Sequence, residues 1–121
     1  MSGLYEMLKP DFMFRDARGE LVQLVHTGYE QVNVLASRAG TIRGGHYHKH
    51  SREAFYVISG SVALTFRRDG RQEQRTFYAG EFFLIHPYVV HSMDFSEDCV
   101  LVGLYDHCVE GKNGEKDIFT E

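Results

Sequence analysis

Residues 40–60 of this 121-residue chain read GTIRGGHYHKHSREAFYVISG, and this stretch decides the fold. His46 and His48 are two positions apart, so both imidazoles point to the same face if the segment is a strand. Glu53 follows a polar corner and begins the next β-type run, where an antiparallel neighbour would bring its carboxylate beside the histidines. His91 lies on a later run and can supply a third imidazole. The pattern predicts a site where three nitrogens and one oxygen meet, a ligand set that suits iron, nickel, copper, zinc or manganese.

Short β-type runs separated by turn residues extend from this stretch. The run at 53–59 is rich in aromatic and β-branched residues, and the run at 61–68 alternates in polarity. Asp69 and Gly70 form a dipeptide favoured in two-residue hairpin turns. Only residues 3–9 suggest a short turn of helix, which Pro10 would end. We expect an all-β sandwich or barrel with strands at residues 31–35, 41–48, 53–59, 61–68, 71–78, 81–86, 89–95 and 99–106.

The composition excludes several classes of protein. The formal net charge is −4 and there is no basic stripe, so we expect no nucleic-acid partner. No apolar run is long enough to span a bilayer and the first residues do not resemble a signal peptide, so we expect no membrane partner and a cytoplasmic location. Cys99 and Cys108 are too few for a disulfide scaffold and are interpreted as reduced thiols. We expect one domain over residues 1–121, with a short N-terminal extension (1–12) and a polar C-terminal tail (110–121).

The key segment also matches a known motif. The first cupin motif is matched, in identity and in spacing, by Gly40, His46, His48, Glu53 and Gly60. The chain therefore resembles the cupin superfamily over about residues 16–105, and the resemblance implies a jelly-roll β-barrel. It also implies that one divalent metal ion, with zinc, iron, nickel and manganese as candidates, is held by His46, His48, Glu53 and His91. It implies no organic cofactor.

The segment before His91 resembles the second cupin motif, beginning at Gly80. That motif normally has a proline followed two positions later by a glycine. Here His86 occupies the proline position, Pro87 comes one residue later and Tyr88 stands where glycine is expected. The turn before the third histidine therefore departs from the motif.

A narrower resemblance comes from residues 16–21, DARGEL, and residues 43–49, RGGHYHK. Both segments look like those of sugar-modifying cupins. These include dTDP-sugar 3,4-ketoisomerases, dTDP-4-dehydrorhamnose epimerases and the cupin domain of capsular polysaccharide assembly proteins. The resemblance implies that Arg43 holds a substrate phosphate or carboxylate, as a planar guanidinium does well. It implies a sugar-like small molecule as the ligand.

The resemblance implies an enzyme that isomerises or epimerises a nucleotide-linked keto sugar by removing a proton next to the carbonyl. In the ketoisomerases and epimerases a histidine of this strand shuttles the proton without a metal, a role that His48 or His46 would take here. In the capsular type the barrel carries a metal, and the presence of Glu53 and His91 places this chain closer to that type. A metal would polarise the carbonyl.

Two other functions are compatible with the same residues. One is a non-catalytic module that binds a carbohydrate or metabolite, because no acid or base is identifiable beyond the ligand set. The other is oxygen-dependent chemistry at a redox-active metal.

We also expect a homodimer, which the resemblance to small cupins implies, because a short barrel leaves edge strands to protect. Residues 12–25 are the candidate for edge pairing with a second copy. His50 is expected to face solvent and His86 to lie at the rim. His26 and His107 have no context that suggests a function.

Overall fold

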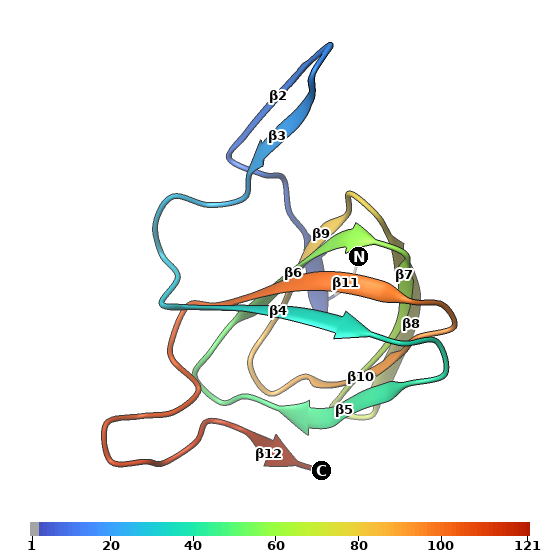
Figure 1. Ribbon diagram of the computed structural model, residues 1–121. Helices are drawn as coiled ribbons and strands as arrows, with labels where there is room; N and C mark the ends of the chain where they lie inside the picture. The colour runs from blue at the N-terminus through green and yellow to red at the C-terminus, as the bar shows by residue number, and fades with distance from the viewer. Residues whose placement is uncertain (1–2) are drawn as a thin grey trace.

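The computed structural model describes residues 3–121, which form strands joined by turns and loops (Figure 1). The strands are β1 (Tyr5–Met7), β2 (Phe12–Asp16), β3 (Gly19–Gln23), β4 (Gln31–Ser37), β5 (Ile42–Tyr47), β6 (Glu53–Ser59), β7 (Ser61–Arg68), β8 (Arg71–Tyr78), β9 (Phe82–Ile85), β10 (Val90–Asp94), β11 (Cys99–Tyr105) and β12 (Phe119–Thr120). The prediction of an all-β chain is confirmed for these residues. Nowhere in residues 3–121 is there a helix with the length and apolar character needed to cross a membrane.

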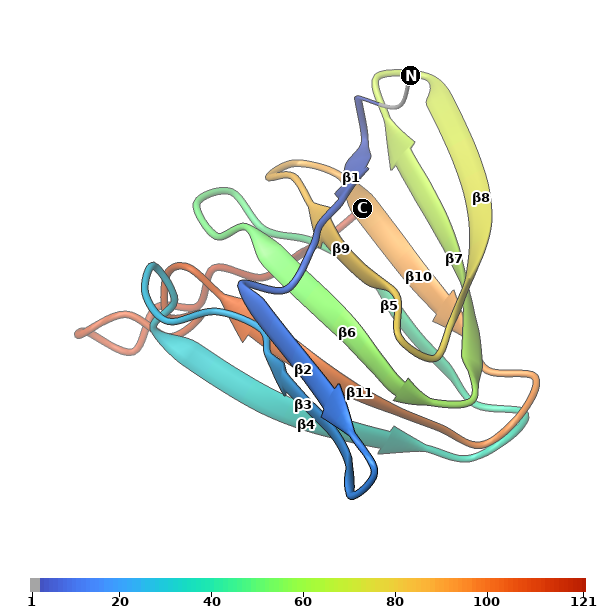
Figure 2. The same cartoon turned by 90° about the horizontal axis from the view of Figure 1, so that it is seen from above.

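Two five-stranded antiparallel sheets pack face to face to form the barrel (Figures 1 and 2). The first, which we call the β4 sheet, has the order β1-β9-β6-β11-β4. The second, the β5 sheet, has the order β12-β5-β10-β7-β8. Apolar side chains from both inner faces fill the space between the sheets, and the largest buried rings are Phe55, Phe66, Phe77, Phe83 and Phe95. Removing these rings from water is the main stabilising contribution to the barrel.

The predicted strands agree closely with the structure. The bounds of β6, β7 and β8 are those expected from the alternation and turn residues. Asp69 and Gly70 connect β7 to β8 with φ values of 52° and 77°. Two successive positive φ values are what a tight two-residue hairpin turn requires, because its twist then matches that of the strands.

The predicted helical turn at residues 3–9 is wrong. Tyr5–Met7 forms β1 and pairs antiparallel with β9. Leu4 is buried in the core, and the ring of Tyr5 stacks on Phe66 at a centroid distance of 4.7 Å. A single turn of helix is unstable because its nucleation is costly, whereas a sheet edge offers partners for the backbone. This part of the predicted N-terminal extension therefore belongs to the barrel, while residues 1 and 2 lie outside the described residues.

Residues 12–23 form a hairpin that stands away from the barrel, which we call the arm (Figure 1). Among the strands in residues 3–121, β2 and β3 pair only with each other. Its large apolar side chains are about half exposed: Phe12, Met13, Phe14 and Leu21. The prediction that this segment pairs with a second copy stays a prediction.

The predicted polar tail at residues 110–121 is more than a surface segment. Its end forms β12, which pairs with the end of β5. The carboxylate of Asp117 accepts hydrogen bonds from the backbone N–H groups of Lys49, His50 and Ser51. The tail therefore supports the corner that follows β5.

Candidate metal centre

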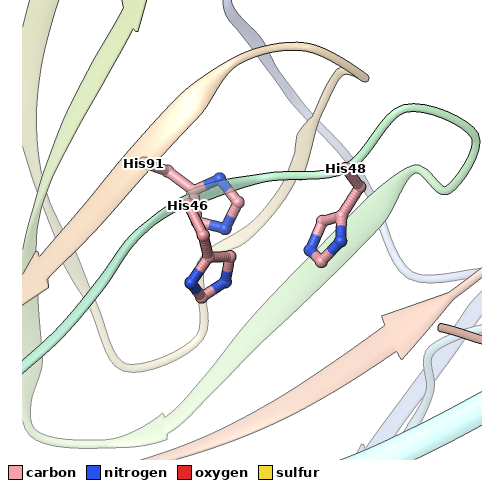
Figure 3. A group of neighbouring side chains, drawn as sticks. All are labelled: His46, His48 and His91. Carbon is pink, nitrogen blue, oxygen red and sulfur yellow. The ribbon is translucent and has the colours of Figure 1, made fainter. Parts of the chain in front are cut away.

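Three histidines from neighbouring strands meet inside the barrel (Figure 3). His46 from β5, His48 directly after β5 and His91 from β10 place their coordinating nitrogens within 4.8 Å of one another. Glu53, the first residue of β6, reaches them from the opposite sheet. Its Oε1 is 3.2 Å from His48 Nε2 and 3.1 Å from His91 Nε2. The structure thus brings together all four predicted side chains, although their role toward a metal stays a prediction.

A bulge in β5 decides which of its side chains enter the barrel. The register between β5 and β10 shifts at Gly45, and both Gly44 and Gly45 have positive φ values, 102° and 78°. A Cβ on Gly44 would lie 2.6 Å from the carbonyl oxygen of His91, so a side chain does not fit there. As a result Arg43 and His46 line the same cavity although they are three positions apart. Strict alternation would have placed them on opposite faces.

Backbone carbonyl groups orient two of the imidazoles. His48 Nδ1 lies 2.5 Å from the carbonyl oxygen of Asp117, and His91 Nδ1 lies 3.1 Å from that of Val89. A carbonyl oxygen only accepts hydrogen bonds, so each Nδ1 carries a hydrogen. Each ring, when neutral, then turns a lone pair on Nε2 toward Glu53. A carboxylate also only accepts, so acceptors face one another across the centre of the site.

This arrangement fits a divalent cation. His91 Nε2 is buried and makes no hydrogen bond in the described part of the chain. The facing lone pairs need a positive charge between them, which a cation or a second proton on an imidazole supplies. Imidazole nitrogens with one carboxylate oxygen form a common ligand set for zinc, iron, nickel and manganese. The residues that would hold the ion are His46, His48, Glu53 and His91.

Burial and neighbouring charges shift the pKa values of these groups. Burial lowers the pKa of His46, and the electrostatic influence of nearby His91 lowers it further, so the His46 ring is neutral at neutral pH. Burial alone would raise the pKa of Glu53, but the contacts with His48 and His91 lower it well below its usual range. Burial alone would lower the pKa of His48, but Glu53 and Asp117 together raise it above its ordinary value. The carboxylate is therefore ionised and draws a proton or a cation toward the site.

The site opens into a cavity of about 360 Å³ between the two sheets. This volume lies within the range of small-molecule binding sites. Arg43 lines the cavity and donates from Nε to the hydroxyl oxygen of Ser37 at 2.9 Å, which leaves its other N–H groups for a ligand. His46 also lines the cavity, together with Leu35, Gly44, Glu53, Phe55, His91, Met93 and Tyr105.

Sequence reasoning missed Tyr105. Its ring stands edge-on to His48 at a centroid distance of 5.6 Å. Burial, together with the negative charge of nearby Glu53, raises the pKa of Tyr105 far above its usual value, so the phenol stays protonated. Its place opposite Glu53 follows from the register of β11 on β6. No motif spacing signals that register.

Asp117 was also missed, because it lies in a polar segment with no strand pattern. Among the remaining histidines, His50 is exposed as expected and His86 is partly buried. His26 and His107 are exposed and lie beside Asp11 and Asp106, away from the site. The other histidines therefore contribute nothing to the cluster.

Solved structures with the same fold place the barrel in a known class. A sugar 3,4-ketoisomerase from Thermoanaerobacterium thermosaccharolyticum in complex with TDP has a TM-score of 0.84 at 20% identity, covering 100% of this chain and 90% of that one. A dTDP-4-dehydrorhamnose 3,5-epimerase from Sulfolobus tokodaii has a TM-score of 0.72 at 17% identity, covering 91% and 79%. The fold is the cupin jelly roll, so the predicted fold and the cupin resemblance are confirmed.

The sequence gives a family within that class. Residues 14–103 match the polysaccharide biosynthesis C-terminal domain, and the chain belongs to that family. A curated relative, the UDP-2-acetamido-2,6-beta-L-arabino-hexul-4-ose reductase of Pseudomonas aeruginosa, is 38% identical over 56 residues. That match covers 46% of this chain and 15% of the relative, so the chain spans a small part of that protein's length.

Proposed function

We propose that this chain is a metal-binding cupin that isomerises or epimerises a nucleotide-linked keto sugar. The observation that carries the proposal is that His46, His48, His91 and Glu53 meet beside the cavity between the sheets, where all but His48 line its wall. The compounds named for the similar proteins support the substrate class. They include TDP-4-keto-6-deoxyglucose and dTDP-4-dehydrorhamnose, both nucleotide-linked sugars with a carbonyl group at C4.

The proposed reaction is proton transfer next to that carbonyl. A divalent cation bound at this site would act as a Lewis acid toward the keto group. Arg43 lines the cavity and is placed to bind a phosphate or hydroxyl group of the substrate.

His46 is better placed than His48 to move the proton in a metal-free reaction. The ring of His46 lines the cavity and is neutral at neutral pH. Both nitrogens of His48 are engaged, one by Asp117 and the other by Glu53. As a base, His46 would take a proton from the carbon beside the carbonyl and return it to another position. A nitrogen that ligates a metal has no free lone pair, so metal content separates the two mechanisms.

The test is hydrogen exchange on the sugar. Purified protein is incubated with TDP-4-keto-6-deoxyglucose in D₂O, and proton NMR follows the positions next to the carbonyl. Deuterium is expected there, and His46→Ala is expected to slow its entry by about 100-fold or more, because general acid–base groups contribute that much. His50→Ala, an exposed histidine nearby, is the control and should keep the wild-type rate. Tight binding without any exchange would contradict catalysis and support a binding module.

Elemental analysis tests the metal separately. We expect close to one divalent ion per chain in the purified protein and loss of it in His48→Ala, with His50→Ala again as the control. Full exchange activity in protein shown to be free of metal would overturn the metal part alone. Equal rates with and without oxygen would exclude oxygen-dependent chemistry.

A further inference from the structure

A second cavity, of about 550 Å³, lies against the outer face of the β5 sheet and shares no lining residue with the cavity at the metal centre. Tyr47 and Tyr88 contribute to its wall, and the β7–β8 hairpin contributes Arg67, Arg68 and Arg71. We call this region the arginine–tyrosine groove. Its residues have no part in the proposed reaction, so their arrangement calls for a separate explanation.

Tyr88 holds a conformation that bulky residues rarely adopt. Its φ is 68°, in the left-handed region, which is strained for a residue other than glycine. The backbone N–H of Tyr88 donates to the carbonyl oxygen of His48 at 2.7 Å, which holds the turn in place. A glycine would meet the same backbone requirement without strain. The presence of tyrosine at this position points to a use for its ring.

The ring of Tyr88 ends a stack of three aromatic rings. Tyr47 lies between Tyr88 and Phe119, at centroid distances of 6.1 Å and 5.6 Å and interplanar angles of 25° and 30°. Lys49 lies over the Phe119 ring, and the guanidinium of Arg68 is 5.9 Å from the centroid of the Tyr88 ring. Even so, 49% of the surface of Tyr88 stays exposed. The stack holds an aromatic surface in a fixed orientation at the groove, as a ring-binding platform requires.

Each arginine of the groove forms an ion pair with an acidic residue at the protein surface. The ion pairs are Arg67–Glu121, Arg68–Asp69 and Arg71–Glu73. The three arginine side chains are 42–56% exposed, and exposed ion pairs contribute little to stability. An incoming anion can therefore replace these partners at small cost. Two of the acidic partners, Asp69 and Glu121, line the groove and the third, Glu73, does not, so Arg71 is the arginine whose partner lies outside the groove.

We propose that the arginine–tyrosine groove binds an anionic saccharide, with a sugar ring against Tyr88 and a phosphate or carboxylate on the arginines. The apolar face of a pyranose ring packs well on an aromatic ring. A guanidinium offers paired N–H donors that match the oxygens of a phosphate or a carboxylate. Arg67 already pairs with the carboxylate of Glu121 at the groove, the same kind of contact that a ligand anion would make there. This site is additional to the cavity between the sheets and does not depend on the proposed reaction.

Tyr88→Gly separates recognition from folding. Glycine suits a φ of 68°, so the variant is expected to melt at or above the wild-type temperature although the ring is lost. Calorimetric titration with trigalacturonic acid and with glucose 1-phosphate should show binding to the wild type and about tenfold weaker binding to the variant. Tyr78→Ala removes a tyrosine that is 59% exposed and lies outside the groove, and should leave binding unchanged.

Arg71→Ala tests the anionic half of the ligand. We expect about tenfold weaker binding of both compounds, because a charge-assisted hydrogen bond is lost. Arg15→Ala is the matched control, since Arg15 is also an exposed arginine paired with a glutamate, but on the arm. His46→Ala, in the other cavity, should also leave binding unchanged.

The outcomes separate clearly. Binding of only one of the two compounds supports the groove and identifies its anion. Equally tight binding of inorganic phosphate or of neutral maltotriose overturns the joint role of ring and charge. The proposal also fails if neither compound binds the wild type, if Tyr88→Gly and Arg71→Ala keep wild-type affinity, or if His46→Ala abolishes binding.

Discussion

The two sheets of the barrel share one core but differ on their outer faces. On the β4 sheet the outer positions are apolar, and Val34, Val102 and Tyr56 lie side by side across three strands. Val34 and Val32 are 68% and 62% exposed. Elsewhere on this face Leu8, Leu24, Val25 and Tyr29 of the same chain pack against the sheet, so the exposed apolar surface is concentrated on β4.

On the β5 sheet polar side chains occupy the middle of the outer face, and Ser92, Thr65 and Gln74 lie side by side across three strands. Each sheet contains a register shift, between Val100 and Leu101 in the β4 sheet and at Gly45 in the β5 sheet, but only the shift at Gly45 adjoins the histidine cluster. The comparison teaches that the two sheets divide the tasks of the barrel. The β5 sheet positions most of the candidate functional side chains, and the β4 sheet exposes apolar side chains on β4.

The exposed apolar face of β4 favours the predicted homodimer. In one copy, the arm exposes apolar side chains, and β4 leaves both its outer face and one edge without a partner among the described strands. A second copy related by two-fold symmetry supplies the complement of each surface, because each arm can lie on the β4 sheet of the other copy. We therefore expect the arm and the β4 sheet to form the dimer contact.

The largest loss of stability is expected from a side chain added at the bulge of β5. In Gly44→Ala the new Cβ would lie 2.6 Å from the carbonyl oxygen of His91 at a φ of 102°, so β5 and β10 must separate. We expect a loss of about 3 kcal/mol or more in the free energy of unfolding, because a backbone clash adds to backbone strain. Urea unfolding measures this loss. Gly45→Ala, with a φ of 78° but open space around its Cβ, is the control and should cost less than half as much. Equal losses in both variants would show that the close approach to His91 is unimportant.

A charge on the apolar face tests the other side of the comparison. Val34→Glu is expected to weaken dimerisation on the order of 100-fold, because the interface would bury an unpaired carboxylate. Sedimentation at several concentrations measures the change. Ile42→Glu is the matched control, since Ile42 is a β-branched residue that is 73% exposed on the β5 sheet. A monomeric wild type, or equal weakening by both variants, would contradict the assignment of this face.

Mixing two variants shows whether the arm acts between copies. Phe14→Lys on the arm and Val34→Glu on the β4 sheet should each be mostly monomeric alone. An equimolar mixture is expected to regain dimers. In a dimer of one copy of each variant, the arm of the Val34→Glu copy meets the β4 sheet of the Phe14→Lys copy, and neither surface is substituted. Failure of the mixture to dimerise would exclude an exchange of arms between copies.

A smaller loss of stability is expected at the corner after β5, where Asp117 accepts backbone hydrogen bonds. Burial alone would raise the pKa of Asp117, but hydrogen bonds from three backbone N–H groups more than offset this, so its pKa lies below the ordinary value of 3.8. A carboxyl whose pKa is lowered by folding stabilises the protein above its unfolded pKa and loses that effect as pH falls through its folded pKa. Asp117→Asn should therefore cost about 1 kcal/mol at pH 7, a modest value because the group is only partly buried.

Urea midpoints at pH 7 and at pH 2 measure this dependence. The difference between Asp117→Asn and the wild type should shrink at the lower pH. Asp69→Asn removes the same charge from the β7–β8 turn and is the control. A difference that stays constant with pH would show that the carboxylate charge of Asp117 is not what stabilises the corner.

Local sequence patterns predicted much of the fold and of the candidate site. The alternation of 61–68 and the Asp69-Gly70 dipeptide predicted the β7–β8 hairpin with its bounds, because strand propensity and turn chemistry act over a few residues. Residues 3–9 were mispredicted because their strand state depends on pairing with β9, nearly 80 positions away along the chain. Tyr105 and Asp117 were missed for the same reason, since their neighbours at the site come from distant segments.

The order of residues by itself determined the all-β class, most strand bounds and the set of His46, His48, Glu53 and His91, because these depend on spacing along single strands and on a recognisable motif. The tertiary structure decided the strand state of β1, the entry of Arg43 into the cavity and the apolar outer face of the β4 sheet. Those features arise from register, bulges and packing between segments far apart in the chain. Such contacts leave no periodic signal in the sequence.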